Sequence, residues 1–220
     1  MLNIPNIQQA MSVFVAEELS EVLNTKVVIG RINMGLLNRI IIDDVLLDDQ
    51  SGQEMLKVTR LSAKFDIMPF FKGKISISSV QLFGFNINLR KETPDSPPNF
   101  KFVLDAFASK DTVKKENSLD LRINSILIRR GRMSYHVLSE EETPGKFNAK
   151  HIQLQNIIAN ISLKALSKDS LNLGIKRLSL DEKASGFSLK KMSLKLVANN
   201  KQTNIDNFTI ELPETSLKLD

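Results

Sequence analysis

The side chains that could perform chemistry in this sequence are few and lie far apart. The two histidines are His136, which follows Tyr135 at the end of an expected strand, and His151, which begins the next one. Neither has metal-ligand spacing or a serine in a nucleophile-elbow context, and there is no glycine-rich phosphate loop. Cysteine is absent, which excludes thiol chemistry and disulfides. Because an enzyme needs convergent reactive groups, the sequence predicts no enzyme, no cofactor and no metal site.

Two clusters of charge could bind ions or charged partners. The densest basic cluster is either a turn with exposed charge or a contact for an anionic headgroup or an acidic partner, made by Arg129, Arg130 and Arg132. Four aspartates between residues 43 and 49 lack the alternating ligands and distal Glu of an EF-hand. The stretch Asp48–Gly52 instead indicates a solvated turn, with Gly52 free to adopt a positive φ.

The amino-acid composition and net charge limit the kinds of molecule that this chain is expected to bind. Apolar residues make up 42% and charged residues 25% of the 220 residues, which is ordinary for one folded soluble domain. No apolar run is long enough to span a membrane and no signal peptide is evident, although an anchor could precede Met1. The net charge of +5 favours an anionic partner, either nucleic acid or lipid headgroups. With no Trp and one Tyr to stack on bases, we expect no nucleic-acid partner.

The strongest pattern is an apolar–polar alternation that slips and then resumes. In ISISSVQLFGFNINL, residues 75–89, apolar residues lie at offsets 0, 2, 5, 7, 12 and 14. Residues 121–135 repeat these six offsets, and four-position copies begin at residues 27, 40, 56, 173 and 187. Alternation puts residues on one face of a strand, and a step of three moves the next pair to the other face. One extra residue at Ser78-Ser79, a β-bulge, would restore the facing and curve the sheet.

The remaining segments complete the predicted fold. Helical spacing over residues 5–23 predicts an amphipathic helix with an acidic face, which either caps the end of the sheet or lies at a membrane. A second short helix is expected over residues 99–108, with a helical turn at 69–73, a mobile segment at 109–118 and a hairpin tip at 139–145.

The predicted fold class is mainly β with minor α: a long curved antiparallel sheet forming an open groove or half-pipe, with the two helices packed at it. We expect one module over residues 1–220. Its parts are the helix at 5–23, a first strand set at 26–91, a loop and short helix at 92–118, and a second strand set at 119–220.

Three stretches resemble a known family. Residues 67–89 contain a Pro-Phe-Phe turn, then Gly-Lys-Ile-Ser-Ile-Ser-Ser-Val-Gln-Leu, then Asn-Ile-Asn-Leu. Residues 4–8 read Ile-Pro-Asn-Ile-Gln, and Pro98-Asn99-Phe100 precedes the expected short helix. Together these are similar to the AsmA-like superfamily, and within it to the TamB-like translocation and assembly module proteins of the Bacteroidetes type. The resemblance covers residues 2 to 135 and thins to generic strand repeats afterwards.

The resemblance implies an N-terminal fragment of a longer periplasmic protein of outer-membrane biogenesis. A missing N-terminal anchor would hold that protein in the inner membrane, and a missing C-terminal part would reach an Omp85-class barrel. The implied function is phospholipid transport along an oil-lined β-groove. The alternative is a scaffold that assists assembly of outer-membrane barrels or autotransporters through a strand edge.

The apolar positions of the repeat are the side chains that we expect to line such a groove. An open apolar face of this kind needs a cover, which acyl chains could provide. Acyl chains of phospholipid would lie along Ile75, Ile77, Val80, Leu82, Ile87, Leu89, Leu121, Ile123, Ile126 and Ile128.

Overall fold

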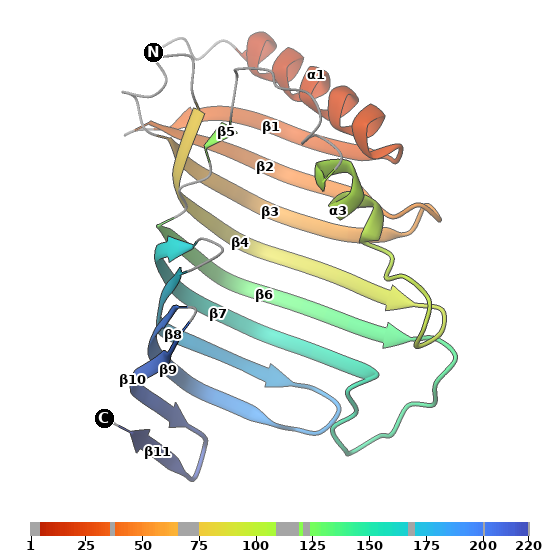
Figure 1. Cartoon of the computed structure of the whole chain (residues 1–220). Coiled ribbons are helices and arrows are strands. Elements are labelled where there is room, and N and C mark those ends of the chain that lie inside the picture. Colours follow the sequence, from red (N-terminus) through yellow and green to blue (C-terminus); the bar gives the residue numbers. More distant parts are fainter. Residues whose placement is uncertain are drawn as a thin grey trace.

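One open β-sheet dominates the structure, a computed structural model that describes residues 5–35, 38–65, 75–108, 119–120, 124–166, 170–199 and 201–219. The sheet curves along its strands and is not closed into a barrel (Figure 1). This confirms the predicted fold class. The strands are β1 (Val27–Gly35), β2 (Arg39–Asp48), β3 (Glu54–Phe65), β4 (Ile75–Lys91), β5 (Leu119–Asp120), β6 (Ser125–Val137), β7 (His151–Leu166), β8 (Ser170–Glu182), β9 (Ser188–Asn199), β10 (Thr203–Glu211) and β11 (Ser216–Leu219).

The sheet is an antiparallel meander with one parallel joint. Ten strands follow one another in the order β1-β2-β3-β4-β6-β7-β8-β9-β10-β11, and the two-residue β5 pairs beside β4. The pairs β4–β6 and β4–β5 are parallel, whereas the sequence predicted an antiparallel sheet throughout. The cause is the long connection after β4, which includes a helix and returns the chain to the same end of the sheet.

The two helices lie where the sequence placed them. Helix α1 spans Pro5–Leu23, as predicted, and α3 spans Lys101–Ala108, two residues shorter at its start. Figure 1 shows α1 along the β1 edge and α3 across β2 and β3. Val15 and Leu19 of α1 and Phe102 of α3 pack on a core that includes Ile29 and Leu47. Helix α1 therefore caps one end of the sheet. The predicted turn at 69–73 and mobile segment at 109–118 lie outside the described residues.

The predicted bulge at Ser78 is confirmed by the pairing of β3 with β4. Lys64 lies opposite Ser79 and Phe65 lies opposite Ile77, so Ser78 is an extra residue on β4. Opposite residues share a face of the sheet. The register brings Phe65 and Ala63, two residues apart on β3, opposite Ile77 and Val80, three residues apart on β4. The side-chain exposure of Ile77 lies outside what the structure describes.

A second line of irregular residues crosses the middle of the sheet. Asp44 on β2, Gly84 on β4, Arg130 on β6 and Asn156 on β7 have φ of 56°, 64°, 54° and 54°. Gly84 lies beside Arg130, because Phe83 pairs with Arg129 in the parallel joint. Left-handed backbone is uncommon outside glycine and marks bulges and bends. Each of these residues lies inside a slip of the apolar alternation, so the slips on β2, β4, β6 and β7 lie along one line across the sheet.

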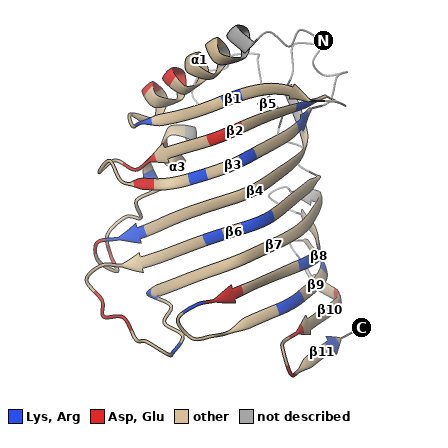
Figure 2. Ribbon diagram, turned by 180° about the vertical axis from the view of Figure 1, so that it is seen from behind, with Lys and Arg blue, Asp and Glu red and all other residues tan. Residues whose placement is uncertain are grey.

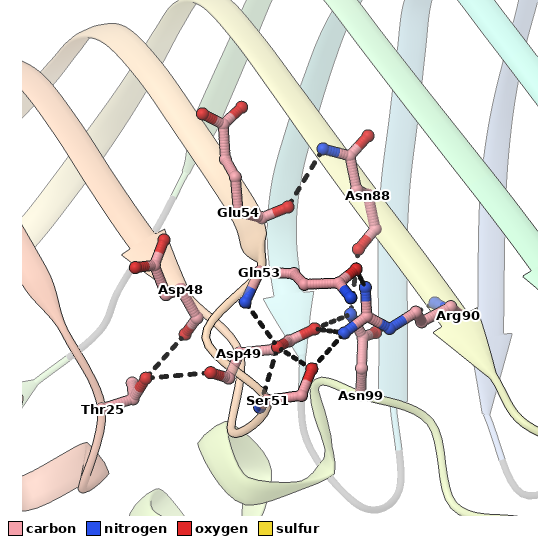
Figure 3. Close-up of polar contacts among 9 residues, drawn as sticks. All are labelled: Thr25, Asp48, Asp49, Ser51, Gln53, Glu54, Asn88, Arg90 and Asn99. Atoms are coloured by element: carbon pink, nitrogen blue, oxygen red, sulfur yellow. Dashed lines mark hydrogen bonds and ion pairs between the residues drawn. The ribbon is translucent and has the colours of Figure 1, made fainter.

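A polar network at the β2–β3 turn holds α3 against the sheet (Figure 3). The Asp49 carboxylate accepts hydrogen bonds from Ser51 Oγ at 2.7 Å and from the backbone N–H groups of Ser51 and Gln53 at 3.0 and 3.1 Å. Arg90 at the end of β4 forms an ion pair with Asp49 at 2.6 Å. Asn99, just before α3, donates to Asp49 Oδ2 at 3.1 Å and to the Asn88 carbonyl at 3.0 Å.

The network corrects one expectation about the turn at Asp48–Gly52. The turn and the positive φ of Gly52, 75°, are as predicted, but Asp49 is only 2% exposed rather than solvated. Burial alone would raise the pKa of Asp49. Hydrogen bonds from Ser51, Asn99 and the backbone N–H of Gln53 outweigh it, so the pKa lies below its ordinary value. The aspartate is therefore a structural anion that joins the turn, β4 and α3.

Candidate functional site

One face of the sheet carries an apolar ladder, which we define as the chain of directly paired residues that crosses ten strands. Each member lies opposite the next in the strand pairing, so all point to the same side. Its members are Ile32, Ile42, Leu61, Leu82, Ile128, Ala159, Leu178, Met192, Ile210 and Leu217. At ~4.8 Å per strand spacing, nine spacings give an arc of roughly 43 Å.

A second apolar ladder runs beside the first, towards the starts of β4 and β6. It crosses eight strands and consists of Met34, Ile40, Ala63, Val80, Ile126, Ile161, Ile175 and Leu194. A third, Val27, Leu47, Leu56, Ile87, Met133 and Leu154, ends at Glu182 on β8. We call the side of the sheet that carries these ladders the apolar face.

The centre of the apolar face is buried, although the described residues form a single sheet. Val58 and Phe85 are 4% and 7% exposed, and Ile157 is 8% exposed. They pack against half-buried neighbours that include Leu61 and Leu82. Gly131 makes this close packing possible: a Cβ at Gly131 would lie 2.4 Å from the Phe85 ring, so the ring occupies the space that a side chain would take. Lateral contact between strands therefore buries the middle of the face.

The structure brings together the groove residues that it describes. Val80 lies beside Ile126 and Leu82 beside Ile128 in the parallel joint, and all four are half-buried. Ile87 and Leu89 are also half-buried, beside Met133 and Tyr135. Ile75 and Ile77 belong to β4, but the structure does not describe their side chains. Leu121 and Ile123 lie outside the described residues. Sequence reasoning missed Phe85, because the apolar repeat has no position between Leu82 and Ile87, where the alternation slips at Gly84.

The helices cover only one end of the apolar face. Helices α1 and α3 pack against a buried cluster on β1, β2 and β3 that includes Ile32, Leu47 and Met55. The ladder continues over β4 and β6 to β10, beyond both helices in Figure 1. Among the described residues, the members from Leu61 to Ile210 are half-buried, apart from the buried Ala159. The uncovered part is thus apolar and still partly open to solvent.

The opposite side of the sheet, which we call the charged face, bears a different row. One residue away from the ladder on each strand lie Arg31, Asp43, Arg60, Phe83 and Arg129, which are paired in this order. Arg60 Nε contacts Asp43 Oδ1 at 2.6 Å, and Arg31 lies 3.6 Å from its other oxygen. Figure 2 shows basic positions in the middle of β3 and β6.

The predicted anionic contact lies on this charged face. Arg129 is paired with Phe83, and the Arg130 guanidinium lies 5.1 Å from the centre of the Phe83 ring. Arg132 is beside Asn86, next to the ladder pair Ile87 and Met133, so it too points away from the apolar face. All three arginines are exposed. They cannot touch the same stretch of a ligand as the apolar ladder does.

Glu182 marks where the third ladder stops. It is 2% exposed, and its carboxylate accepts hydrogen bonds from the N–H groups of Gln153, Ala184 and Ser185 and from Ser185 Oγ. Burial would raise the pKa of Glu182, but these hydrogen bonds outweigh it and lower the pKa to about 2. The buried carboxylate therefore caps the β8–β9 turn as a fully bonded anion.

Sequence reasoning also missed one cluster of ionisable residues. His136 and His151 pair directly across the β6–β7 hairpin, and Glu142 in the connecting loop approaches them. The signal was present, because both histidines flank the predicted hairpin tip at 139–145.

Within the described residues, none of the helices is both long and apolar enough to cross a membrane.

No model of a known protein family matches the chain, and no curated protein matches its sequence.

Proposed function

We propose that the chain is a non-enzymatic lipid-binding module that holds phospholipid acyl chains on its apolar face. The observation that carries this proposal is the apolar ladder itself, which is half-buried over β3 to β10 and uncovered beyond the helices. Soluble monomers rarely expose contiguous apolar surface of this extent, and such a surface marks a binding site. An acyl chain suits the ladder because it needs apolar contact and no hydrogen bonds.

The dimensions of the ladder also fit acyl chains. A bilayer hydrocarbon core is roughly 30 Å thick, so one leaflet is roughly 15 Å deep. The ladder is roughly 43 Å long, which allows chains to lie anywhere along it and to move from strand to strand. This supports conduction along the sheet rather than a single fixed pocket.

The cellular setting of this proposal rests on the sequence resemblance. As a part of a TamB-like protein, the module would act in the periplasm between an inner-membrane anchor and an Omp85-class barrel. Phospholipid would then pass between the two membranes along the apolar face.

Acyl-chain burial predicts how affinity should vary with the ligand. Each buried CH₂ contributes ~0.8 kcal/mol, so two additional methylenes should tighten binding by about tenfold. Headgroup identity should matter little, because the exposed arginines of β6 lie on the other face. A chain-length series of lysophospholipids, titrated by fluorescence displacement, measures both effects.

The decisive experiment compares adjacent residues on the two faces. Val80→Asp and Ile126→Asp put a carboxylate on the apolar face, whereas Gln81→Asp and Leu127→Asp put it one residue away on the charged face. We expect the first pair to abolish photo-crosslinking to phospholipid and the second pair to retain it. Thermal melts accompany all four variants. Collapse of the melting transition in both apolar-face variants, or equal crosslinking in all four, would contradict the proposal.

A specific observation supports the alternative function as a scaffold. In the described chain β11 pairs only with β10, and all four of its residues are exposed. The end strand of a sheet is a position where an added strand can pair by β-augmentation. Capture of an unfolded barrel peptide at β11, competed by a β10–β11 edge peptide and not by lysophospholipid, would favour the scaffold.

A further inference from the structure

The β6–β7 hairpin gathers three metal-ligating side chains at one end of the sheet. His136 and His151 are directly opposite each other, and their Nδ1 atoms are 3.0 Å apart. Glu142 Oε1, from the loop between the strands, lies 3.8 Å from His136 Nδ1. One ligand atom from each of the three residues lies within 4.8 Å of the other two.

The ring of His151 is already oriented as a ligand. Its Nε2 lies 2.9 Å from the Glu140 carbonyl oxygen, which can only accept, so Nε2 carries the proton. The Nδ1 lone pair is then directed at His136. A ligating histidine almost always donates its other N–H to a carbonyl or carboxylate in this way. His151 is 7% exposed, which fixes the ring further.

The loop that carries Glu142 is held by its own hydrogen bonds. Asn148 Nδ2 donates to the Glu141 carbonyl at 3.1 Å, and the His151 N–H donates to the Asn148 carbonyl at 3.0 Å. Lys150 forms an ion pair with Glu140 at 2.6 Å, so Glu140 is engaged elsewhere and Glu142 is the carboxylate left for the histidines. The histidines and their neighbouring loop are therefore preorganised.

We propose that His136, His151 and Glu142 form a binding site for Zn²⁺. Two imidazole nitrogens and one carboxylate oxygen are a zinc donor set, whereas Ca²⁺ and Mg²⁺ prefer oxygen ligands alone. With Zn–N distances of about 2.05 Å, two nitrogens of a tetrahedral site lie roughly 3.3 Å apart. The two Nδ1 atoms therefore need to separate only slightly to admit the ion. A cavity of 260 Å³ adjoins Glu142 and His151 on the side away from His136 and is also bounded by Asn148.

Bound zinc would tie the loop to both strands that flank it. The loop carries two exposed apolar side chains, Leu138 at 54% and Phe147 at 64%. Zinc would fix how these two side chains are presented at the end of the sheet. This inference is independent of lipid binding, because it uses none of the ladder residues.

The sequence makes the test clean, because the chain has two histidines and no cysteine. Untagged protein is titrated with ZnCl₂ by calorimetry, with MgCl₂ as the control metal. We expect one Zn²⁺ per chain and no Mg²⁺ binding. Long-range ¹H–¹⁵N NMR should show both Nδ1 resonances, and neither Nε2 resonance, shifting on saturation with zinc.

Matched variants test each ligand separately. His136→Gln should weaken zinc binding by about a hundredfold or more, and Glu142→Gln by about tenfold. Glu141→Gln, one residue away and exposed, should bind as the native protein does. The absence of saturable 1:1 binding would overturn the proposal and leave a hydrogen-bonded histidine pair. Native affinity in Glu142→Gln would overturn the three-ligand site even if His136→Gln proved unable to fold.

Discussion

The two faces of the sheet are built from alternate residues of the same strands, yet they are stabilised in different ways. On the apolar face Ile42, Leu61 and Leu82 meet in a row, and the adjacent residues of the same strands, Asp43, Arg60 and Phe83, form a row on the charged face. The first row gains stability from apolar contact across strands. In the second row the buried Asp43 pairs with Arg60 and Arg31, whose own exposure to water weakens each ion pair.

The comparison teaches that side-chain contact across a strongly curved single layer can make a dry core. Val58 is 4% exposed on the apolar face, and its neighbour Thr59 is exposed on the other side. The slips at Asp44, Gly84 and Arg130 occur at matching positions between the first and third ladders, so they keep the two sets of residues on opposite faces of β2, β4 and β6. Substitutions that move charge from one face to the other test this separation.

The largest effect is expected at the buried centre of the apolar face. Val58→Asp places a carboxylate where no partner exists, which should cost about 4 kcal/mol or unfold the chain. Lys57→Asp, an exposed neighbour on the charged face, should change the free energy of unfolding by about 0.5 kcal/mol at most. Urea unfolding followed by circular dichroism measures both. Equal midpoints would mean that the centre of the face is solvated.

A somewhat smaller effect is expected where the helices cover the apolar face. Asp49→Ala removes the carboxylate that Arg90 and Asn99 share as an acceptor and should cost about 3 kcal/mol. Hydrogen exchange of residues 101–108 should rise, because α3 loses its link to the β2–β3 turn. Asp48→Ala is the control, since Figure 3 shows only the backbone oxygen of Asp48 in the network. Unchanged exchange in α3 would show that apolar packing alone holds the helix.

An effect of ~2 kcal/mol is expected at Glu182, where the third ladder stops. Its pKa is lowered to about 2 in the folded chain, against an ordinary value of 4.5. The stability from this group is therefore complete above about pH 4.5 and falls as the pH drops towards 2.

Glu182→Gln should remove that part of the acid dependence and lower stability at pH 7. The exposed Glu214→Gln should leave the native pH profile intact. Urea midpoints between pH 2 and pH 7 measure the difference. Parallel profiles for the native protein and Glu182→Gln would contradict the assigned hydrogen bonds.

The smallest effect is expected on the charged face. Replacing Arg129 and Arg132 together by Gln should change the free energy of unfolding by about 0.5 kcal/mol at most. Crosslinking to zwitterionic phospholipid should stay within about twofold of native. A large loss of crosslinking would show that headgroups reach the charged face, and the two faces would then act on one ligand.

Local sequence patterns predicted the strands, both helices and the bulge at Ser78, because these depend on alternation and helical spacing along a short stretch. They failed where distant segments meet. The parallel joint of β4 and β6 depends on the whole connection between them, and nothing in either strand indicates direction. Phe85 was missed because the six apolar positions of the repeat include none between Leu82 and Ile87.

The candidate sites show the same limit. The half-buried ladder members on β4 and β6 followed from the repeat, because every strand alternates in the same way. The burial of Asp49 did not, since it depends on Arg90 and Asn99, which are far along the chain. The pairing of His136 with His151 requires the register of a hairpin whose loop has 13 residues, Leu138–Lys150, between the strands. Such a register is set by tertiary contacts rather than by turn chemistry.

The parallel joint has a consequence for how fast the chain reaches its native state. Every other strand pair in the ten-strand path joins neighbours in sequence, so each can form by closing a short loop. The joint instead pairs Ser79 with Ser125, 46 residues apart. Closing a longer loop costs more chain entropy, and non-local pairing slows folding. We therefore expect β1–β4 and β6–β11 to assemble first as separate halves, and their docking along β4 and β6 to be the rate-limiting step.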